Sequence, residues 1–252
     1  MIVHRIPMFQ DNYSYLIVDE VTQMAAVVDP AEPSAVLRLV ADLNVDLVSV
    51  LCTHHHWDHA GGNLAIQHEF PQVAIIGGKY DAPRIPGITA ALDHGDELSV
   101  GRLTGRVLSV PCHTRGHIAY IFEDALFCGD TLFVGGCGRF FEGDATQMYA
   151  ALHDVLGELK DEVRVFCGHE YTVSNLRFCK LVEPANNAID EKLSWALQRR
   201  QCGEFTVPST LGEERTYNPF MRTHHPSVQA FAGSSDPVEV LRVLRQRKDE
   251  FR

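Results

Sequence analysis

The chain has 252 residues, of which 45% are hydrophobic and 22% charged, a composition typical of one large globular domain or of a domain with an appendage. A chain of this length builds a core without disulfides or structural metals, so we expect any metal site in it to serve chemistry rather than folding. The net charge of −11 argues against nucleic-acid binding, because no basic patch interrupts the acidic field in the first 190 residues.

The cysteines and the chain termini indicate the compartment. Seven scattered cysteines, an odd number without a CxxC pair, predict reduced thiols rather than a disulfide framework. The N-terminal "MIVHRIPMFQDNY" lacks the pattern of a signal peptide, and no run approaches the roughly 18 apolar residues of a membrane span. We therefore expect a soluble, cytoplasmic protein with no nucleic-acid or membrane partner. No exposed apolar stripe suggests an obligate partner, so we expect a monomer. The arginine-rich "LRVLRQRKDEFR" is interpreted as a solvated helix face.

Short strands alternate with helices over the first 170 residues. Eight runs rich in β-branched or aromatic residues predict strands, at 13–18, 24–29, 47–52, 73–78, 106–112, 119–124, 125–130 and 163–168. Apolar residues recur at helical spacing over 36–43, and again over 148–159 behind Asp144 as the expected N-cap. The stretch "DHAGGNLAIQHEF" is also expected to be helical. These features predict an α/β fold with helices covering its sheets.

The pattern changes after about residue 171. Helices are predicted at 172–184, 187–201 and 236–251, and the segment 202–221 between them is expected to be a loop. We therefore divide the chain into an α/β domain over residues 1–170 and a mostly helical domain over residues 171–252.

Side chains of metal-ligand type follow the ends of four predicted strands. They occur in "LCTHHHWDH", "VPCHTRGH", "LFCGDT" and "VFCGHEY". Strand ends on one edge of a sheet converge, so we expect these side chains to form one site. Imidazoles and carboxylates without paired thiolates suit zinc, iron or manganese in an open catalytic site.

Backbone geometry sorts the histidine run that follows residue 51. In an extended segment the side chains alternate, so His54 and His56 face one way and His55 the other. Asp58 and His59 follow where the chain turns into a helix. The run is thus expected to give one metal His54 and His56, and a second metal Asp58 and His59. His55 is expected to pack or to support the ligands.

These motifs resemble those of a known family. "THHHWDHAGG" is similar to the HxHxDH signature of the metallo-β-lactamase superfamily, and "VVDP", "PCHTRGH", "CGDTLF" and "CGHEYT" follow in the superfamily's order. With "GGCGRFFEG" and "YNPFMR", the chain resembles the glyoxalase II (hydroxyacylglutathione hydrolase) family over essentially its full length. The resemblance implies an αβ/βα sandwich as the catalytic domain (residues 1–170), followed by a C-terminal helical domain that binds the substrate (residues 171–252). It also implies hydrolysis of S-D-lactoylglutathione to glutathione and D-lactate, the second step of methylglyoxal detoxification.

The resemblance further implies two divalent metal ions, with zinc expected first and iron or manganese also accepted. His54, His56 and His113 would hold one ion, and Asp58, His59 and His169 the other. Asp130 would bridge both, which makes Asp58 and Asp130 the catalytic carboxylates. Asp29 would brace the HxHxDH loop. The two ions would hold a shared water and lower its pKa towards roughly 7 for attack on the thioester.

Substrate contacts are implied for three residues of the same motifs. Arg139, Tyr171 and Arg222 would bind the glutathione part of the substrate. Phe141 stands where some relatives have tyrosine, and His224 and His225 stand where some have another basic residue. These differences predict glutathione binding that uses fewer polar contacts or that relies on partly protonated histidine.

Three cysteines each precede a predicted ligand by two residues, namely Cys52, Cys128 and Cys167. In strand geometry such pairs share a face, so these thiols are expected near the site. We interpret them as small buried apolar residues and predict that none coordinates a metal.

Two alternatives to the thioester hydrolase remain. A mononuclear-iron dioxygenase acting on glutathione persulfide would need one metal and would tolerate the loss of His59 or His169, and both are present. A non-catalytic binding or scaffold relative would be expected to have lost some of the ligand side chains, and all of them are intact.

Overall fold

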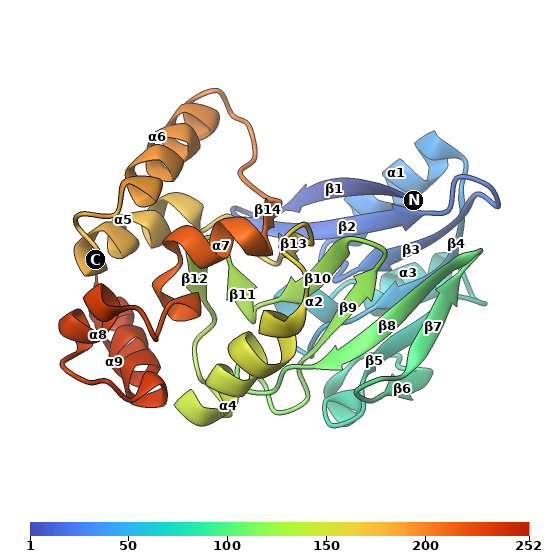
Figure 1. Cartoon of the computed structure of the whole chain (residues 1–252). Coiled ribbons are helices and arrows are strands. Elements are labelled where there is room, and N and C mark those ends of the chain that lie inside the picture. Colours follow the sequence, from blue (N-terminus) through green and yellow to red (C-terminus); the bar gives the residue numbers. More distant parts are fainter. Residues whose placement is uncertain (252) are drawn as a thin grey trace. The chain divides into compact units, whose positions relative to one another are not determined.

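The computed structural model describes residues 1–251 as two compact units. Unit 1 comprises Met1–Ser109 with Thr114–Gly129, and unit 2 comprises Val110–His113 with the described residues from Asp130 onward. Arg252, the last residue of the predicted helical domain, lies outside the described residues. The division predicted between residues 170 and 171 rests on the change from alternating strands and helices to helices alone, and it stays a prediction. The elements of both units are labelled in Figure 1.

The first sheet of unit 1 has a parallel half that ends near the histidine run. Its strand order follows the chain, with β1 (Ile2–Met8), β2 (Asn12–Val18), β3 (Met24–Val28), β4 (Asp46–Leu51), β5 (Ala74–Gly78) and β6 (Ala90–Leu92). β1, β2 and β3 pair antiparallel, whereas β3 to β6 pair parallel. The carboxyl ends of β3, β4 and β5 therefore meet at one edge, where Asp29, Cys52 and Lys79 begin the following loops.

Helices cover one face of this sheet. They are α1 (Pro33–Leu43), α2 (Trp57–Ala60) and α3 (Asn63–Glu69), with the short 3-10 turn η1 (Ala82–Arg84) at the sheet edge. Val36 and Val40 of α1 and Ile66 of α3 are buried in one core with alternate residues of the strands, among them Leu16 and Val27. The apolar spacing over 36–43 predicted α1, and the prediction is confirmed.

The predicted helix over 58–70 is broken in two at Gly61 and Gly62. A Cβ atom on Gly62 would lie 2.0 Å from the carbonyl oxygen of Pro30. The chain can therefore approach the loop after β3 only because residue 62 is glycine. This close approach ends α2 one turn after it begins and keeps the ligand-bearing turn beside Asp29.

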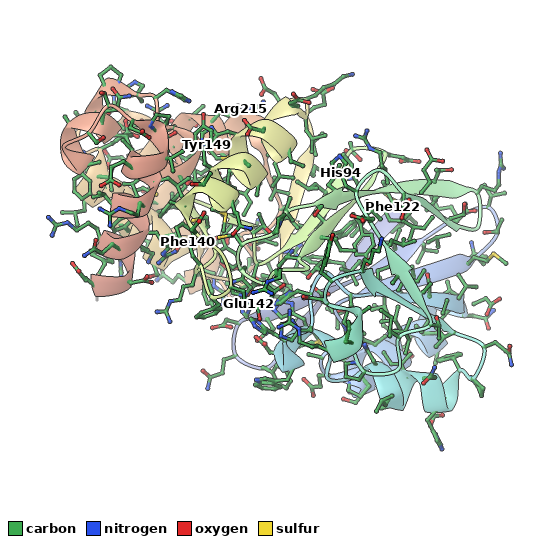
Figure 2. The ribbon with its side chains drawn as sticks, turned by 90° about the horizontal axis from the view of Figure 1, so that it is seen from below. His94, Phe122, Phe140, Glu142, Tyr149 and Arg215 are labelled. Atoms are coloured by element: carbon green, nitrogen blue, oxygen red, sulfur yellow. The ribbon has the colours of Figure 1, made fainter. Side chains whose placement is uncertain are left out.

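A second sheet packs on the other face. Its unit 1 strands are β7 (Glu97–Val100), β8 (Leu103–Ser109), β9 (Ile118–Phe122) and β10 (Ala125–Gly129), paired antiparallel in that order. The ring of Tyr15 on β2 lies 5.6 Å from that of Phe127 on β10. Gly105 pairs with Phe122 across the strands, and the fully buried Phe122 ring (Figure 2) occupies the space that a Cβ at residue 105 would fill.

Unit 2 contains short strands and most of the helices. The strands are β11 (Leu132–Phe133), β12 (Gly136–Cys137), β13 (Arg164–Cys167) and β14 (Ser209–Thr210). The helical segments are α4 (Ala145–Tyr149), η2 (Ala150–Val155), η3 (Leu156–Glu158), α5 (Thr172–Val182), α6 (Asn187–Gln201), α7 (Leu211–Tyr217), η4 (Pro219–Met221), α8 (Pro226–Ala232) and α9 (Pro237–Glu250). The predicted helices at α5, α6 and α9 are confirmed, and so is the α/β class. Along the described chain, no helix is both long and apolar enough to cross a membrane.

Two sequence predictions in unit 2 are wrong in part. The segment 202–221, expected to be a loop, contains β14, α7 and η4. Thr210 and Glu213 form a capping box at the start of α7, a T-x-x-E signal that was present in the sequence. The helix behind Asp144 does begin where predicted, since the Asp144 side chain accepts a hydrogen bond from the Gln147 backbone N–H, but it passes into a π-helical turn and then a 3-10 turn.

Candidate metal centre

The histidine run follows β4 directly, and its first two predicted ligands lie together. His54 Nε2 and His56 Nδ1 are 3.0 Å apart. His54 is fully buried, and its ring also stacks on that of His117 at 4.6 Å. Extended backbone alternation accounts for this arrangement, because residues 54 and 56 project to the same side.

Asp58 and His59 lie in the first turn of α2. His59 Nε2 and Asp58 Oδ2 are 3.8 Å apart. The Asn12 side chain at the start of β2 donates to both the backbone oxygen and the carboxylate of Asp58, at 3.1 and 3.2 Å. The turn between β1 and β2 thereby holds the predicted carboxylate ligand in place.

Asp29 joins three parts of the histidine run. Its Oδ1 accepts from the Thr53 backbone N–H at 2.7 Å, and its Oδ2 accepts from the Thr53 hydroxyl at 2.6 Å. The same Oδ2 lies 3.0 Å from His59 Nδ1. Asp29 adopts a left-handed backbone with φ of 49°, which costs energy in a non-glycine residue and turns the carboxylate into this position. Asp29, His54 and His59 form a cluster of metal-ligand type within 4.8 Å.

His55 is turned away from these groups. Its Nδ1 lies 2.9 Å from Asp81 Oδ2, and its side chain is 17% exposed. This orientation agrees with the alternation expected for an extended segment.

In unit 2, one carboxylate oxygen lies between two imidazoles. Asp130 Oδ2 is 3.4 Å from His113 Nε2 and 3.4 Å from His169 Nε2. These separations exceed those of ordinary hydrogen bonds. They match the spacing of about 3.4 Å between two ligand atoms that each lie about 2.1 Å from one tetrahedral ion. All three residues are buried.

The second ring nitrogen of His113 is also held. His113 Nδ1 lies 3.0 Å from the backbone oxygen of Arg139, which fixes the ring with Nε2 towards Asp130. Ligating histidines commonly bind a carbonyl or carboxylate through their other nitrogen, and His59 does so with Asp29. The donors are imidazoles and carboxylates, so the arrangement suits a divalent metal site.

The neighbouring thiols are kept protonated. Burial raises the pKa of Cys137 and of Cys167 to about 12, and burial also raises the pKa of Cys52 and of Cys112. Metal ligation requires the thiolate. The chemistry of these groups therefore agrees with the interpretation of the cysteines as small apolar residues.

The three predicted substrate residues have different surroundings. The Tyr171 ring is 38% exposed and stacks on His169, with centroids 4.7 Å apart and planes 5° apart. Arg139 Nε binds Asp249 Oδ1 at 3.1 Å. Arg222 binds both oxygens of the buried Glu183, at 2.8 and 3.0 Å, and also the backbone oxygen of Arg215. As a substrate contact Arg222 stays a prediction, and these bonds describe a structural role.

Helix α9 places two cations, Arg245 and Lys248, near Arg139. The sequence predicted both to lie on a solvated helix face. Arg245 is 8% exposed, donates to the backbone oxygen of Cys137 at 2.8 Å, and binds Asp249 at 3.0 Å. Burial and then the charge of Arg245 lower the pKa of Lys248, and Arg139 adds to this effect. We call Arg139, Arg245 and Lys248 the cation cluster. Residues 245, 248 and 249 share one helical face, a spacing that could have signalled it.

The residues at which this chain differs from some relatives have partners of their own. Phe141 is 59% exposed, and its ring lies 5.0 Å from that of His113. His224 Nε2 lies 2.8 Å from the hydroxyl of Tyr149, which is labelled in Figure 2. His225 Nδ1 lies 2.7 Å from the Ser227 hydroxyl.

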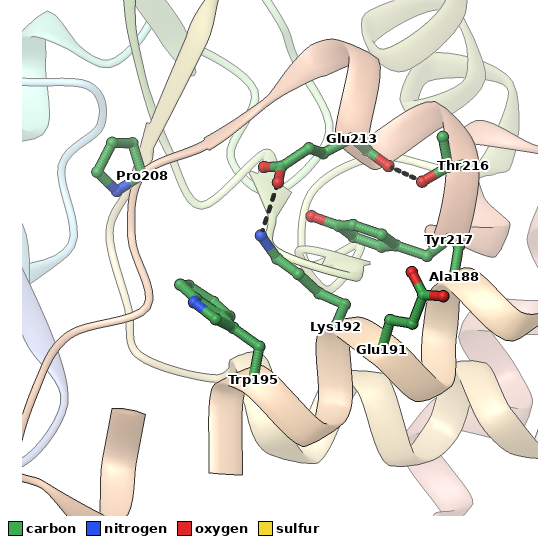
Figure 3. Close-up of a pocket in the computed structure, with 8 residues that line it drawn as sticks. All are labelled: Ala188, Glu191, Lys192, Trp195, Pro208, Glu213, Thr216 and Tyr217. Atoms are coloured by element: carbon green, nitrogen blue, oxygen red, sulfur yellow. Dashed lines mark hydrogen bonds and ion pairs between the residues drawn. The ribbon is translucent and has the colours of Figure 1, made fainter. Parts of the chain in front are cut away.

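Unit 2 also has a pocket of about 420 Å³ between α6 and α7. Its lining residues are Ala188, Glu191, Lys192, Trp195, Pro208, Glu213, Thr216 and Tyr217. Figure 3 shows the ammonium of Lys192 paired with Glu213 at 3.1 Å, and this ammonium also lies 4.2 Å from the centre of the Trp195 ring. The predicted ligands and substrate residues lie elsewhere.

Comparison with known families gives two matches that together span nearly the whole chain. The model of the metallo-beta-lactamase superfamily matches residues 9–169. The model described as hydroxyacylglutathione hydrolase C-terminus matches residues 170–251.

Individual relatives align over the full length. The chain is 47% identical to a cytoplasmic hydroxyacylglutathione hydrolase of Arabidopsis thaliana and 46% identical to a hydroxyacylglutathione hydrolase of Rippkaea orientalis, with 100% of both chains covered in each case. Among solved structures, ETHE1 from Myxococcus xanthus is similar with a TM-score of 0.71 and 29% identity, over 98% of this chain and 90% of that one. The fold is that of the metallo-β-lactamases, with a helical C-terminal part.

Proposed function

Because the chain belongs to the metallo-β-lactamase superfamily and, within it, to the hydroxyacylglutathione hydrolase family, we propose that it hydrolyses the thioester of S-(2-hydroxyacyl)glutathione. With S-D-lactoylglutathione the products are glutathione and D-lactate. One observation in unit 2 carries the proposal. The same unit holds a carboxylate shared by two imidazoles and a cluster of three cations, and the cations suit a substrate with free carboxylates.

Seven side chains would hold two divalent ions. His54, His56 and His113 would bind one, Asp58, His59 and His169 would bind the other, and Asp130 would be shared. The 3.0 Å separation of His54 Nε2 from His56 Nδ1 and the two 3.4 Å separations at Asp130 support this assignment. The ligand types accept zinc, iron or manganese, and zinc is the first choice because of the histidine-rich set.

The chain's own groups orient this centre. When bound, divalent ions polarise a carbonyl and lower the pKa of water towards roughly 7. Asp29 fixes the ring of His59 through Nδ1, and the carbonyl of Arg139 does the same for His113. Asn12 keeps the Asp58 carboxylate in place. The glutathione thiol, with a pKa of about 8.5 as for cysteine, is a good leaving group, so the reaction needs no serine or cysteine nucleophile.

Substrate binding would use the cation cluster and Tyr171. The carboxylates of glutathione would pair with Arg139, Arg245 and Lys248. In the present structure the Asp249 carboxylate binds Arg139 and Arg245 and neutralises part of their charge. The half-exposed ring of Tyr171, stacked on His169, offers an apolar face beside a ligand. Arg222 contributes by holding Glu183. We assign the helical residues 171–252 to substrate binding, together with Arg139, and the rest of residues 1–170 to catalysis. The family matches to 170–251 and 9–169 support this division.

The variant Asp58→Ala tests the two-metal assignment. We expect it to bind one ion fewer per chain and to lose nearly all turnover of S-D-lactoylglutathione, because Asp58 is a ligand of one ion only. Metal analysis and a thioester-hydrolysis assay on the same preparation measure both effects. Full activity with an unchanged metal content would refute the assignment.

A second candidate is favoured by the likeness to ETHE1. A mononuclear-iron dioxygenase acting on glutathione persulfide would need only one metal ion. It would keep its activity when His59 is replaced, whereas the hydrolase would lose activity. The presence of Asp58, His59 and His169 supports the hydrolase.

A further inference from the structure

Asp81 is a fully buried carboxylate in unit 1 that the metal assignment does not use. It follows β5, and so it lies at the edge where the parallel strands β3 and β4 deliver Asp29 and the histidine run. A buried carboxylate is costly unless donors surround it. The donors around Asp81 therefore indicate what it holds together.

The first group of donors belongs to the histidine run. Asp81 Oδ2 accepts from the backbone N–H of His55 at 3.2 Å and lies 2.9 Å from His55 Nδ1. His55 stands between the proposed ligands His54 and His56. Fixing both its backbone and its ring fixes the peptide units that carry the two ligands.

The second group of donors belongs to the loop after β8. The Thr114 hydroxyl donates to Asp81 Oδ2 at 2.7 Å, and the Gly116 backbone N–H donates to Oδ1 at 3.0 Å. A Cβ atom on Gly116 would lie 2.2 Å from the Asp81 backbone nitrogen, so this loop lies directly against residue 81. Thr114 is the immediate neighbour of the proposed ligand His113.

The remaining donor balances the charge. Arg84, three residues on, donates to Oδ1 at 2.6 Å. Burial raises the pKa of Asp81, but the hydrogen bonds from His55, Thr114 and Arg84 outweigh burial and hold this pKa below 3.8. Five donors thus converge on a group that is acceptor-only when ionised.

We propose that Asp81 is a positioning residue that fixes two ligand-bearing loops at once and thereby sets the affinity of the protein for its divalent metals. The proposal rests on the metal assignment under the proposed function. It extends that assignment to a residue that is not itself a proposed ligand. Groups of this kind typically change metal affinity by about 10- to 100-fold when replaced.

The variant Asp81→Asn keeps the size of the side chain but turns an amide NH₂ towards donors. The matched control is Asp19→Asn, because Asp19 is also a buried carboxylate of unit 1. It accepts from the Thr22 hydroxyl, from the Val21 backbone N–H and from the Arg102 backbone N–H. These partners hold a turn and a strand connection that carry no proposed ligand.

The measurement is the dissociation constant of Zn²⁺, obtained by chelator competition with the full chain, together with the visible absorption spectrum of the Co²⁺ form. We expect Asp81→Asn to bind Zn²⁺ about 10- to 100-fold more weakly and to alter the Co²⁺ spectrum. Asp19→Asn should match the wild type in both. If Asp81→Asn does not fold, Thr114→Val removes a single donor and should weaken Zn²⁺ binding several-fold.

Wild-type affinity in Asp81→Asn or Thr114→Val would overturn the proposal. So would an equal loss in Asp19→Asn, because that loss would reflect general destabilisation. If the wild type binds metal but does not hydrolyse glutathione thioesters, the proposed reaction fails and the role of Asp81 stands. If the wild type binds no divalent ion, both fail.

Discussion

At the scale of single residues, a buried ion pair in unit 2 determines what Arg222 does. Glu183 is 2% exposed, and each of the three guanidinium nitrogens of Arg222 donates a hydrogen bond, two of them to this carboxylate. Breaking such a pair from one side leaves a buried charge uncompensated. The stability of the protein, rather than substrate affinity, is therefore expected to depend on Arg222.

We expect Arg222→Ala to lower the free energy of unfolding by about 3 kcal/mol, with little change in KM for the thioester. Urea denaturation and steady-state kinetics on the same sample test this. Arg245→Ala is the comparison, because it removes a member of the cation cluster and is expected to raise KM. A raised KM for Arg222→Ala with unchanged stability would restore its role as a substrate contact.

The same pair predicts a pH dependence. Burial raises the pKa of Glu183, but hydrogen bonds from Arg222 and Ser227, with the charge of Arg222, hold it below its ordinary value of 4.5. A lowered folded-state pKa means that the stabilisation is fully present above about pH 4.5 and is lost as the pH falls through the folded-state value. The stability difference between wild type and Glu183→Gln should therefore shrink below pH 4.5. A difference that is constant from pH 6 to 3 would contradict the assignment.

Residue-level prediction from the sequence worked where local geometry decides. The alternation of an extended segment was sufficient to place His54 and His56 together and to turn His55 away. Asp81 could not be found this way, because its partners at residues 55, 114 and 116 are distant in sequence. Its one signal, a carboxylate shortly after the apolar strand predicted at 73–78, is too common to single it out.

At the scale of elements, helix α7 fastens the hairpin of β11 and β12. The fully buried Glu214 accepts from the Gly135 backbone N–H at 2.9 Å, and also from Ser209, Tyr217 and Asn218. Asn218 in turn donates to the backbone oxygens of Phe133 and Gly136. Asp130 precedes this hairpin and Arg139 follows it, so α7 helps to set the positions of a proposed ligand and of a proposed substrate contact.

Glu214→Ala is expected to lower the free energy of unfolding by about 3 kcal/mol, because it leaves several buried donors without an acceptor. The neighbouring Glu213→Ala should cost about 1 kcal/mol, since it removes only the capping box and an exposed ion pair. Urea denaturation gives both values, and hydrogen exchange at the Gly135 amide reports on the hairpin directly. Equal effects of the two variants, with unchanged exchange at Gly135, would refute the role of Glu214 in holding the hairpin.

Elements were predictable where their signals are local. The apolar spacing of α1, the cap at Asp144 and the eight apolar strands were all visible in the sequence. The edge strand β1 was not predicted, because His4, Arg5 and Pro7 interrupt its apolar pattern. The strands β11, β12 and β14 have two residues each and depend on tertiary hydrogen bonds, such as those from Asn218.

At the scale of the whole molecule, the order of the motifs along the chain was sufficient to predict the family and the fold, and the comparisons confirm both. The substrate-binding surface was less accessible to prediction. The sequence of the helix that contains Arg245 and Lys248 predicts a solvated face. Only the structure shows that Arg245 donates to the backbone oxygen of Cys137 and that Asp249 binds both Arg139 and Arg245. Charge pattern alone does not distinguish such a cluster from a surface.

The most direct test of the account is release of the glutathione thiol from S-D-lactoylglutathione by the metal-loaded wild type, followed in parallel with oxygen consumption on glutathione persulfide. We predict rapid thiol release, much slower release from a thioester of a simple thiol without the glutathione carboxylates, and no oxygen uptake. Oxygen uptake on the persulfide without thioester hydrolysis would contradict the account and identify the dioxygenase instead.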